Sequence, residues 1–399
     1  MKLFKKDIFS IIIFTLIVFP FYAFSDNAFD NNTYTNIKYI LRLILIAILI
    51  ANVRRLKIFP SKKHSAFQLY ILFIFFALVS IIFSYEKGYS FVKFGEISLI
   101  LFSSIYLVNT KTTNIDDIPK LVFKLCFIYI FGFLIIGNTI YPSLYRAMGF
   151  EGQLRLGGGI INPNLLAYCF LALILSAQFL KTKINSIFLI FVQLLAIYLL
   201  FLTYSRSALI LFTLLLIYRL ISRNKFFLIL LFPIFLFLQA NYDLIISFLE
   251  RGDGLESLTT LSGRIPVWLE LVEKYEFSIY SFFGYGYQML SSSGMGVKIS
   301  SWGTNSITEL TMAHNNILQV LYGMGFTGLL LMLLIIFFWK REIDILKNNK
   351  IGIFFNSFFW LILVFSLVEF GVFGTPNFLV LIFSILIFSL HKYVRPKIN

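Results

Sequence analysis

Charged residues are scarce in this chain, and that scarcity excludes an ordinary soluble protein. Only 13% of the 399 residues are charged, about half the share of roughly 25% found in soluble domains, whereas 59% are hydrophobic. A soluble fold of this length has no use for so much apolar surface, but a lipid bilayer accommodates it. We therefore expect a single all-α membrane domain over residues 1–399.

Cysteines are also few, and a nucleotide-binding motif is absent from the sequence. The two cysteines, Cys126 and Cys169, fall inside apolar runs, so we expect small core residues and neither a disulfide nor a metal pair. No Gly-x-x-x-x-Gly-Lys-Ser/Thr phosphate loop occurs, which argues against the use of ATP. The sequence thus predicts a protein that works without a cofactor.

What the chain does contain is a series of long apolar runs. A membrane-spanning helix needs about 20 mostly apolar residues. Residues 8–24 follow three lysines, as a signal peptide would, but the run is long and no clear cleavage site follows it, so we interpret it as a span. The sequence predicts twelve spans, at residues 8–24, 37–53, 66–84, 91–109, 121–140, 160–180, 187–203, 207–222, 226–247, 314–339, 351–371 and 376–391.

Basic residues alternate between the two sides of these spans. One side receives 23 of the 34 Lys and Arg residues, in short clusters between the apolar runs. Because basic loops mark the cytoplasmic side of a membrane, both chain termini are expected in the cytoplasm. The net charge of +15 follows from this topology, so nucleic-acid binding is not expected.

Two longer segments, residues 141–159 and 248–313, fall on the outer side. The second is long enough to fold outside the lipid, as a large loop with short helices, and loops on a rigid scaffold often carry function. Residues 262–275 within it are predicted to be helical. This helix suits either the membrane interface or packing against other helices. Its expected apolar face consists of Ile265, Trp268, Leu269 and Val272.

Two arginines stand out on the outer side. Arg206 lies in the tight turn Thr203-Tyr204-Ser205-Arg206 between two apolar runs, and Arg264 follows Gly263 at the start of the predicted helix. A charge this close to lipid is costly and usually has a purpose. A snorkelling side chain or an exposed helix start would explain either residue without a functional role.

His314 is the single histidine expected on the outer side. It lies in Ala313-His314-Asn315 at the start of the tenth span, whereas His64 and His391 fall in basic stretches that we expect to be solvated. No second outer histidine and no Cys-x-x-Cys pair accompany it, which argues against zinc. An imidazole, with an ordinary pKa of about 6.5, can accept a proton from a hydroxyl at neutral pH, although a lone histidine is often structural.

A glycine-rich loop precedes the sixth span. It begins at Arg155, contains Gly157-Gly158-Gly159 and ends at Asn164. Glycines permit close approach of a backbone to a ligand, or make an ordinary flexible loop. Arg155 and Asn164 are therefore candidate substrate-binding residues. Asn315 is a third candidate, with capping of the following helix as the alternative.

Arginines and an imidazole at one outer cavity suggest a chemical logic. Arginine stays charged and binds a diphosphate in a forked geometry. A substrate that carries its own leaving group needs neither ATP nor a metal ion. A polyprenyl-diphosphate sugar is such a substrate, and its lipid tail would explain an enzyme embedded in a membrane.

These features resemble the O-antigen ligase and O-antigen polymerase superfamily of bacterial membrane glycosyltransferases. The resemblance rests on the Ser205-Arg206 turn, the Gly263-Arg264 to Trp268 stretch, and His314-Asn315 leading into a span with Gly325 and Gly328. The order of these motifs fits as well. The resemblance covers about residues 155–340 by motif and the whole chain by its twelve-span layout.

The resemblance implies a GT-C-like fold and a metal-independent, inverting glycosyltransferase. It implies transfer of a glycan from an undecaprenyl-diphosphate carrier to an acceptor hydroxyl on the periplasmic side of the inner membrane. By this likeness, Arg206 and Arg264 would hold the diphosphate and stabilise its developing charge. His314 would act as the general base on the acceptor hydroxyl, or would orient it.

The resemblance leaves the acceptor open. A ligase delivers a finished chain to lipid A–core, whereas a polymerase delivers a growing chain to a second carrier-linked repeat unit; the length and twelve-span layout suit a ligase slightly better. A related exopolysaccharide or protein-glycosylating enzyme is a third alternative. Twelve spans also suit a transporter or a lipid-linked-sugar flippase, but no internal repeat is visible, and the intramembrane charges Arg42, Glu96 and Glu369 are scattered in the sequence.

Overall fold

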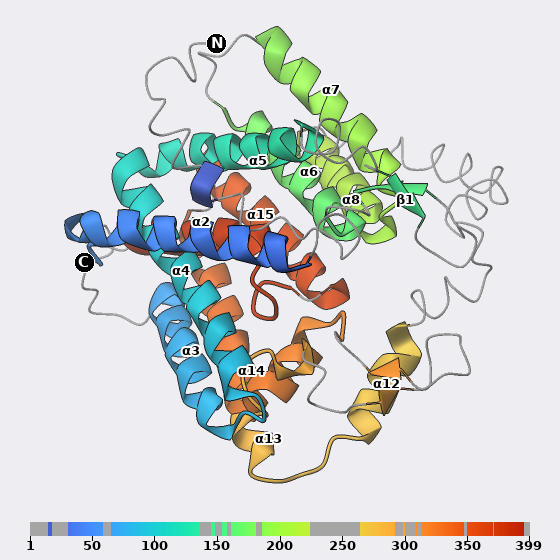
Figure 1. Ribbon diagram of the computed structural model, residues 1–399. Helices are drawn as coiled ribbons and strands as arrows, with labels where there is room; N and C mark the ends of the chain where they lie inside the picture. The colour runs from blue at the N-terminus through green and yellow to red at the C-terminus, as the bar shows by residue number, and fades with distance from the viewer. Residues whose placement is uncertain are drawn as a thin grey trace, which may run out of the picture.

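The described part of the chain is almost entirely helical (Figure 1). The computed structural model describes residues 15–17, 31–58, 65–135, 145–147, 154–157, 161–180, 186–223, 264–291, 298–299, 308–309, 313–346, 349–369 and 371–394. The helices are α2 (Asn31–Ala51), α3 (Ala66–Ser80), α4 (Lys87–Lys111), α5 (Ile118–Ile135), α6 (Pro163–Gln178), α7 (Ser186–Leu202), α8 (Arg206–Arg223), α12 (Arg264–Glu273), α13 (Tyr280–Phe283), α14 (Asn316–Ile345), α15 (Lys350–Val368) and α16 (Phe378–Tyr393).

Short elements connect these helices. Two antiparallel strand pairs lie in the outer segments, β1 (Tyr145–Ala147) with β2 (Leu154–Leu156) and β3 (Lys298–Ile299) with β4 (Thr308–Glu309). Single helical turns of the tighter 3-10 type are η2 (Val53–Arg55), η3 (Ile81–Phe83), η4 (Ile115–Asp117) and η6 (Met289–Ser291).

The helices follow the predicted spans. Ten of the twelve predicted runs coincide with a described helix; 226–247 lies outside the described residues, as does 8–24 apart from residues 15–17. Within the described residues, five helices are long and apolar enough to cross a membrane: α3 with η3, α4, α5 with η4, α14 and α15. The chain is thus an all-α, polytopic membrane protein, whereas the count of twelve spans and the GT-C likeness stay predictions.

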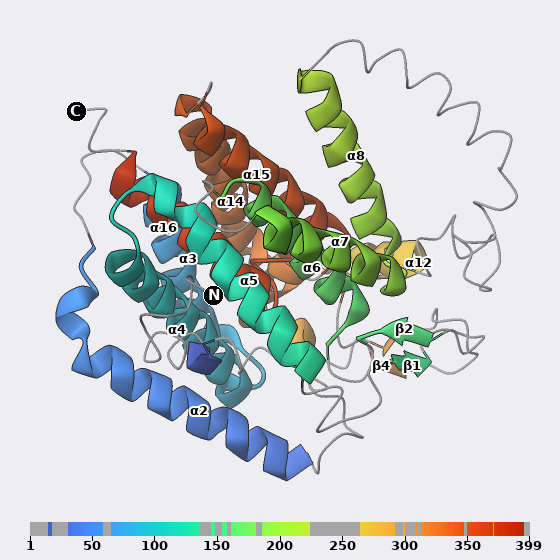
Figure 2. The ribbon, with the colours of Figure 1, turned by 90° about the horizontal axis from the view of Figure 1, so that it is seen from above.

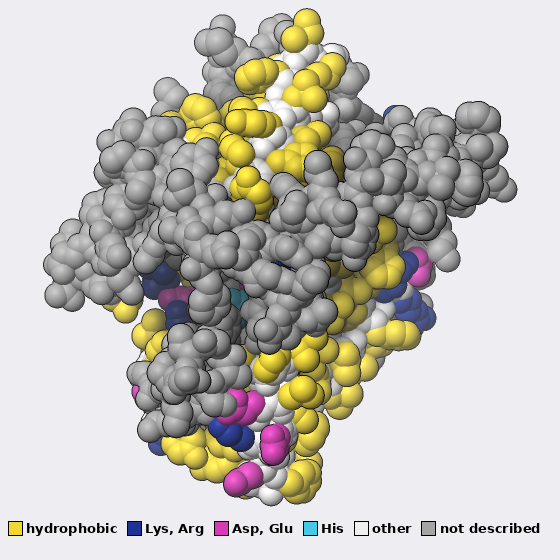
Figure 3. All heavy atoms as spheres, turned by 90° about the vertical axis from the view of Figure 1, so that its right-hand side faces the viewer, with side chains coloured by type: hydrophobic (Ala, Val, Ile, Leu, Met, Phe, Trp, Pro, Cys, Tyr) yellow, Lys and Arg dark blue, Asp and Glu magenta, His cyan; other side chains and the backbone are white. Residues whose placement is uncertain are grey.

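The surface agrees with a lipid environment. Figure 3 shows that hydrophobic side chains cover much of the described surface on one face, with charged side chains in small groups among them. Large apolar residues such as Phe75, Leu330 and Phe337 are 59%, 57% and 62% exposed. In water such a surface would be unfavourable, but in a bilayer it lies against lipid tails.

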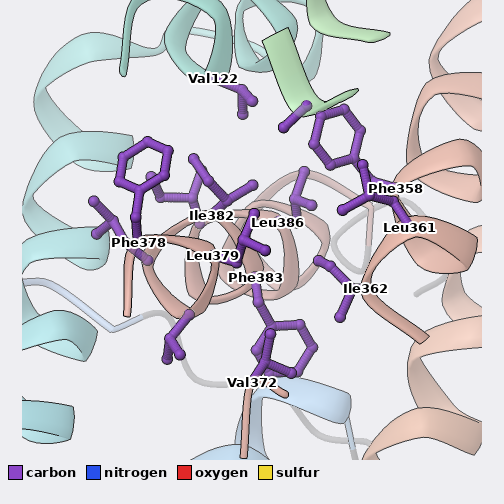
Figure 4. Packing of buried hydrophobic residues seen from close by; sticks show 14 of the residues in the cluster. Val122, Phe358, Leu361, Ile362, Val372, Phe378, Leu379, Ile382, Phe383 and Leu386 are labelled. Atoms are coloured by element: carbon purple, nitrogen blue, oxygen red, sulfur yellow. The ribbon is translucent and has the colours of Figure 1, made fainter. Parts of the chain in front are cut away.

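The core is built around α16, whose side chains from Phe378 to His391 are all buried. A helix that is apolar on every side is stable only at the centre of a bundle or in lipid. Figure 4 shows α16 end-on, with Val122 of α5 on one side and Phe358 and Leu361 of α15 on another. Both cysteines are buried in this core without a disulfide, as predicted.

The bundle has two ends that gather alternate connections. At one, which we call the Glu342 end, α3 begins where α14 finishes: the Ala66 amide donates to Glu342 Oε1 at 3.1 Å. The last turns of α4 and α16 also meet there, since the Tyr393 hydroxyl donates to the Thr112 carbonyl at 2.9 Å. This arrangement matches the alternation of sides that the basic clusters predict.

His391 lies at the Glu342 end and contradicts our expectation of a solvated surface residue. Its side chain is only 2% exposed. Its Nδ1 lies 3.2 Å from the Ser65 hydroxyl oxygen, and its ring centroid lies 5.0 Å from that of Phe67. Basic neighbours in the sequence suggested solvent, but the last turn of α16 stays inside the helix bundle.

The opposite end, which we call the His314 end, holds the outer segment against a break in α14. Gly325 interrupts that helix with φ +64° and ψ −166°. There the Tyr285 amide donates to the Tyr322 carbonyl at 2.8 Å, and the Gly286 amide donates to Gly323 at 3.1 Å. A Cβ on Gly325 would lie 2.4 Å from the Phe282 backbone, so only glycine permits this close contact.

Candidate active site

A buried carboxylate, Glu369, lies at the centre of the polar groups of the His314 end. It follows the last residue of α15, and its side chain is 0% exposed. Its Oε1 accepts from Arg264 Nη2 at 2.7 Å and from Asn164 Nδ2 at 2.6 Å. Its Oε2 lies 3.2 Å from His314 Nδ1. Three residues that are far apart in the sequence therefore meet at the carboxyl group of Glu369.

The electrostatics of Glu369 fix its protonation state. The Arg264 guanidinium at 2.7 Å and the Asn164 amide at 2.6 Å both donate to its carboxyl, and these contacts favour the charged form. Glu369 is therefore ionised at neutral pH and only accepts hydrogen bonds. Consequently His314 Nδ1 carries the proton of that bond, and Nε2 is the ring nitrogen that does not contact Glu369.

Arg155 and Asn164 form a second layer behind Glu369. The buried Arg155 donates from Nη2 to Asn164 Oδ1 at 2.9 Å, and from Nε to the Thr203 carbonyl at 2.9 Å. Asn164 thus accepts from one arginine while it donates to Glu369. β2, the start of α6 and the turn before α8 are therefore held in one network.

The turn before α8 is conformationally constrained. Tyr204 has a positive φ of 48°, a conformation that costs free energy for a residue other than glycine. The Thr203 side chain caps the turn, since its hydroxyl accepts from the Ser205 amide at 3.3 Å. Arg206 then begins α8, three residues after the carbonyl that holds Arg155. Ser207 interacts with Tyr168, which in turn is close to Glu369 and Arg264.

Four helices begin around this network. α6 begins beside Asn164, α8 at Arg206, α12 at Arg264, and α14 two residues after His314. A helix N-terminus carries partial positive charge and N–H groups without partners in the helix, so it favours an anion and disfavours a cation. Arginine as the first residue of both α8 and α12 therefore adds positive charge where it is already concentrated, as an anion-binding site requires.

The position of His314 is set by helix packing and by its own backbone. Its φ is +47°, a left-handed conformation that is uncommon for histidine. α12 packs beside it, since Trp268 Nε1 donates to the Ala313 carbonyl at 2.7 Å. The Tyr322 hydroxyl of α14 donates to the Leu271 carbonyl of α12 at 2.6 Å. These contacts fix Arg264, at the start of α12, relative to His314.

The packed face of α12 differs in part from the predicted one. Val267 and Leu271 are buried and Trp268 is partly buried, whereas Leu269 and Val272 are 66% and 61% exposed. The helix therefore packs on the rest of the protein with one face and leaves two apolar side chains outside. Both alternatives for this helix, packing and a membrane-facing surface, are compatible with the arrangement.

The structure places the six predicted site residues in different positions relative to Glu369. The structure brings Arg264, His314 and Asn164 into direct contact with Glu369 and attaches Arg155 to the same network. Arg206 lies at the adjoining helix start. The Asn315 side chain accepts from the amides of Ile317 and Leu318 as the N-cap of α14, which is the alternative considered for it.

Glu369 is the residue that sequence reasoning missed. It stood out only as one of three scattered intramembrane charges, 55 positions after His314 in the sequence and without a motif around it. One signal was present: a single carboxylate at the outer end of an apolar span, opposite the outer arginines, requires a cationic partner.

Comparison with known proteins agrees with the motif analysis. Residues 191–333 match a family model described as O-antigen ligase. The matched segment contains Arg206, Arg264 and His314, and it ends before Glu369. No curated protein gives a significant match to the chain. The family match confirms the similarity of this chain to the O-antigen ligase and O-antigen polymerase superfamily.

Proposed function

We propose that this protein joins glycans: it transfers a glycan from an undecaprenyl-diphosphate carrier to an acceptor hydroxyl on the periplasmic side of a bacterial inner membrane. The family match and the apolar helices support membrane-bound glycan transfer in general. One observation carries the specific proposal: the buried carboxylate of Glu369 holds His314 with one oxygen and Arg264 with the other. A base and an anion-binding group thus share one orienting residue.

His314 is the proposed general base. With Nδ1–H donated to Glu369, its Nε2 can accept the proton of an acceptor hydroxyl. The hydroxyl oxygen then attacks the anomeric carbon while the bond from that carbon to the diphosphate oxygen breaks. The carrier leaves as undecaprenyl diphosphate, and the proton passes to His314. Glu369 stabilises the resulting imidazolium, as a buried carboxylate does in a catalytic triad.

Arg264 and Arg206 are the proposed diphosphate-binding residues. Arg264 donates to Glu369 and to the Val368 carbonyl, which fixes the plane of its guanidinium group. A guanidinium has five N–H donors, so three remain for phosphate oxygens. Arg206 and the N–H groups at the starts of α8 and α12 add further positive charge. These groups stabilise the negative charge that develops as the diphosphate leaves.

Attack on the face opposite the diphosphate makes the proposed reaction inverting. Because the diphosphate is already a good leaving group and fixed arginines neutralise its charge, we propose that no metal ion is required. No ATP is needed for the same reason. The arrangement of twelve spans, with both termini in the cytoplasm and residues 248–313 as one large periplasmic loop, belongs to this proposal.

The proposed acceptor is lipid A–core, as for an O-antigen ligase. The alternative is a second carrier-linked glycan, as for an O-antigen or exopolysaccharide polymerase. Both reactions use the same base and the same diphosphate site, so they differ only in where the acceptor lipid binds. A flippase or transporter would require no general base, and the His314–Glu369 pair gives no advantage to such a protein.

Reconstitution tests this proposal. The purified protein is placed in liposomes with a carrier-linked glycan, and lipid A–core and carrier-linked repeat units are offered separately. We expect joined product and released undecaprenyl diphosphate in equal amounts with one of the two acceptors, in the presence of a strong chelator. Movement of the donor between leaflets without joined product would instead support a flippase, and no product with either acceptor would refute glycan joining.

A further inference from the structure

A second group of charged side chains lies between α2 and α4, away from the Glu369 network. Arg42 Nη2 of α2 lies 2.7 Å from Glu96 Oε1, and Lys93 Nζ lies 3.2 Å from Glu96 Oε2. Lys38, one helical turn before Arg42, interacts electrostatically with the same three groups. Charges that were scattered in the sequence are therefore gathered into a basic cluster of Lys38, Arg42, Lys93 and Glu96.

The basic cluster carries more positive than negative charge in a low-dielectric place. Its three cations face one carboxylate, and the side chains of Arg42, Lys93 and Glu96 are only 15%, 20% and 11% exposed. Aromatic faces give partial support, since Arg42 lies 5.8 Å above the Tyr39 ring and Lys93 lies 5.4 Å above that of Tyr89. Positive charge at membrane depth is costly unless an anion offsets it.

The cluster lies toward the His314 end of the bundle. α2 and α4 run side by side in the same direction: Arg42 meets Glu96, and thirteen residues later the Arg55 carbonyl accepts from Asn109 Nδ2 at 2.9 Å. Lys38, Lys93 and Glu96 lie in the first half of their helices, Arg42 lies just past the midpoint of α2, and Figure 2 shows α2 at the edge of the bundle. A Cβ placed on Gly95 would meet no atom of a neighbouring element within 4 Å, so there is open space beside this residue.

Tyr287 of the outer segment interacts electrostatically with this cluster. Its ring is 2% exposed, and its hydroxyl is close enough to Glu96 and Tyr89 to interact with them electrostatically. Within the described residues, that hydroxyl has no hydrogen-bond partner. The next residue, Gln288, donates to the Gly374 carbonyl in the loop that follows Glu369. A buried hydroxyl of the outer segment thus interacts electrostatically with the carboxylate of the cluster, and the next residue contacts the loop that follows Glu369.

We propose that the basic cluster binds the phosphate or diphosphate group of the acceptor lipid. This inference rests on the proposed glycan-joining function, because only a reaction between two lipid-linked partners needs a second phosphate site in the same leaflet. The donor diphosphate occupies the site of Arg264 and Arg206, and the acceptor phosphate binds Lys38, Arg42 and Lys93. Lipid A and a carrier-linked repeat unit both bring the required phosphate.

The test uses the double variant K38Q/K93Q, which keeps the Arg42–Glu96 ion pair and therefore the helix packing. A matched control, K274Q/K340Q, removes two lysines from the ion pairs Lys274–Glu270 and Lys340–Asp344 elsewhere on the protein. In reconstituted transfer, we expect K38Q/K93Q to raise KM for the acceptor lipid about tenfold because two charge-assisted contacts are lost. KM for the donor, and kcat at saturating acceptor, should not change.

A binding measurement keeps this test independent of catalysis. Native mass spectrometry of the purified protein compares retention of lipid A, undecaprenyl diphosphate and phosphatidylglycerol. We expect wild type and K274Q/K340Q to retain the acceptor's lipid in preference to phosphatidylglycerol, and K38Q/K93Q to lose that preference. An unchanged acceptor KM, an equal effect of the control, or equal retention of phosphatidylglycerol would overturn the proposal. Absence of transfer by wild type would refute glycan joining and leave the binding comparison to decide the phosphate site.

Discussion

Replacement of Glu369 by glutamine is the most informative single change. Glutamine keeps the size and shape of the side chain but removes its negative charge. Arg264 would then lack its charged partner, and one amide N–H₂ group would face donors from Arg264, Asn164 or His314. The change therefore breaks an ion pair and introduces a donor–donor contact in a buried place.

The expected magnitude follows from these contacts. Loss of one partner of a buried ion pair costs about 3–5 kcal/mol. Arg264 retains 16% exposure of its side chain, so we expect the lower end of that range. Without the carboxylate, His314 loses the acceptor that fixes its tautomer and stabilises its protonated form. In a serine-protease triad, replacement of the buried aspartate by asparagine lowers kcat about 10⁴-fold. For Glu369→Gln we expect the transfer rate to fall about 10²–10⁴-fold.

The chain provides a matched control in Glu342. It is also a buried carboxylate, 3% exposed, but it accepts from the Ala66 amide at the opposite end of the bundle. Glu342→Gln should lower stability without lowering transfer per folded molecule. The assay is glycan transfer in liposomes, normalised to protein that remains monodisperse in detergent. Transfer by Glu369→Gln at the wild-type rate would refute the role of Glu369 in orienting His314.

Three further predictions concern the same site. His314→Ala should accumulate as folded protein and lose transfer; wild-type turnover would remove His314 as the base. Arg206→Lys and Arg264→Lys should each reduce transfer at least about tenfold, because an ammonium group cannot reproduce the fork of a guanidinium; full activity of Arg206→Lys would leave Arg206 as a snorkelling anchor. Transfer should survive a strong chelator, and a loss that only divalent metal restores would contradict the metal-free mechanism.

The sequence predicted the arrangement of helices well because lipid imposes a simple rule on it. Apolar runs had to become helices, so ten predicted runs coincide with described helices. His391 was an exception, since the position of a helix end relative to its neighbours depends on packing and not on the residues beside it.

The site was predictable only in part. Arg264 stood out as a charge near lipid, His314 as the single outer histidine, and Arg155 and Asn164 as the ends of a glycine-rich loop. The structure joins all four in one network. The carboxylate at the centre of this network was not recognised, because its partners lie 55 to 205 positions away and no local spacing connects them. The positive φ values of Tyr204 and His314 are likewise set by tertiary contacts.

The central claim is that His314 acts as the base while the arginines bind the diphosphate. Measuring donor binding and the transfer rate separately tests this claim most directly. The measurement is Kd for undecaprenyl-diphosphate glycan together with its single-turnover rate, for wild type and His314→Ala in the same liposomes. If His314 is the base and the arginines hold the diphosphate, Kd stays within about threefold while the rate falls by at least about 10²-fold. A variant that binds the donor and transfers its glycan at the wild-type rate would contradict the account.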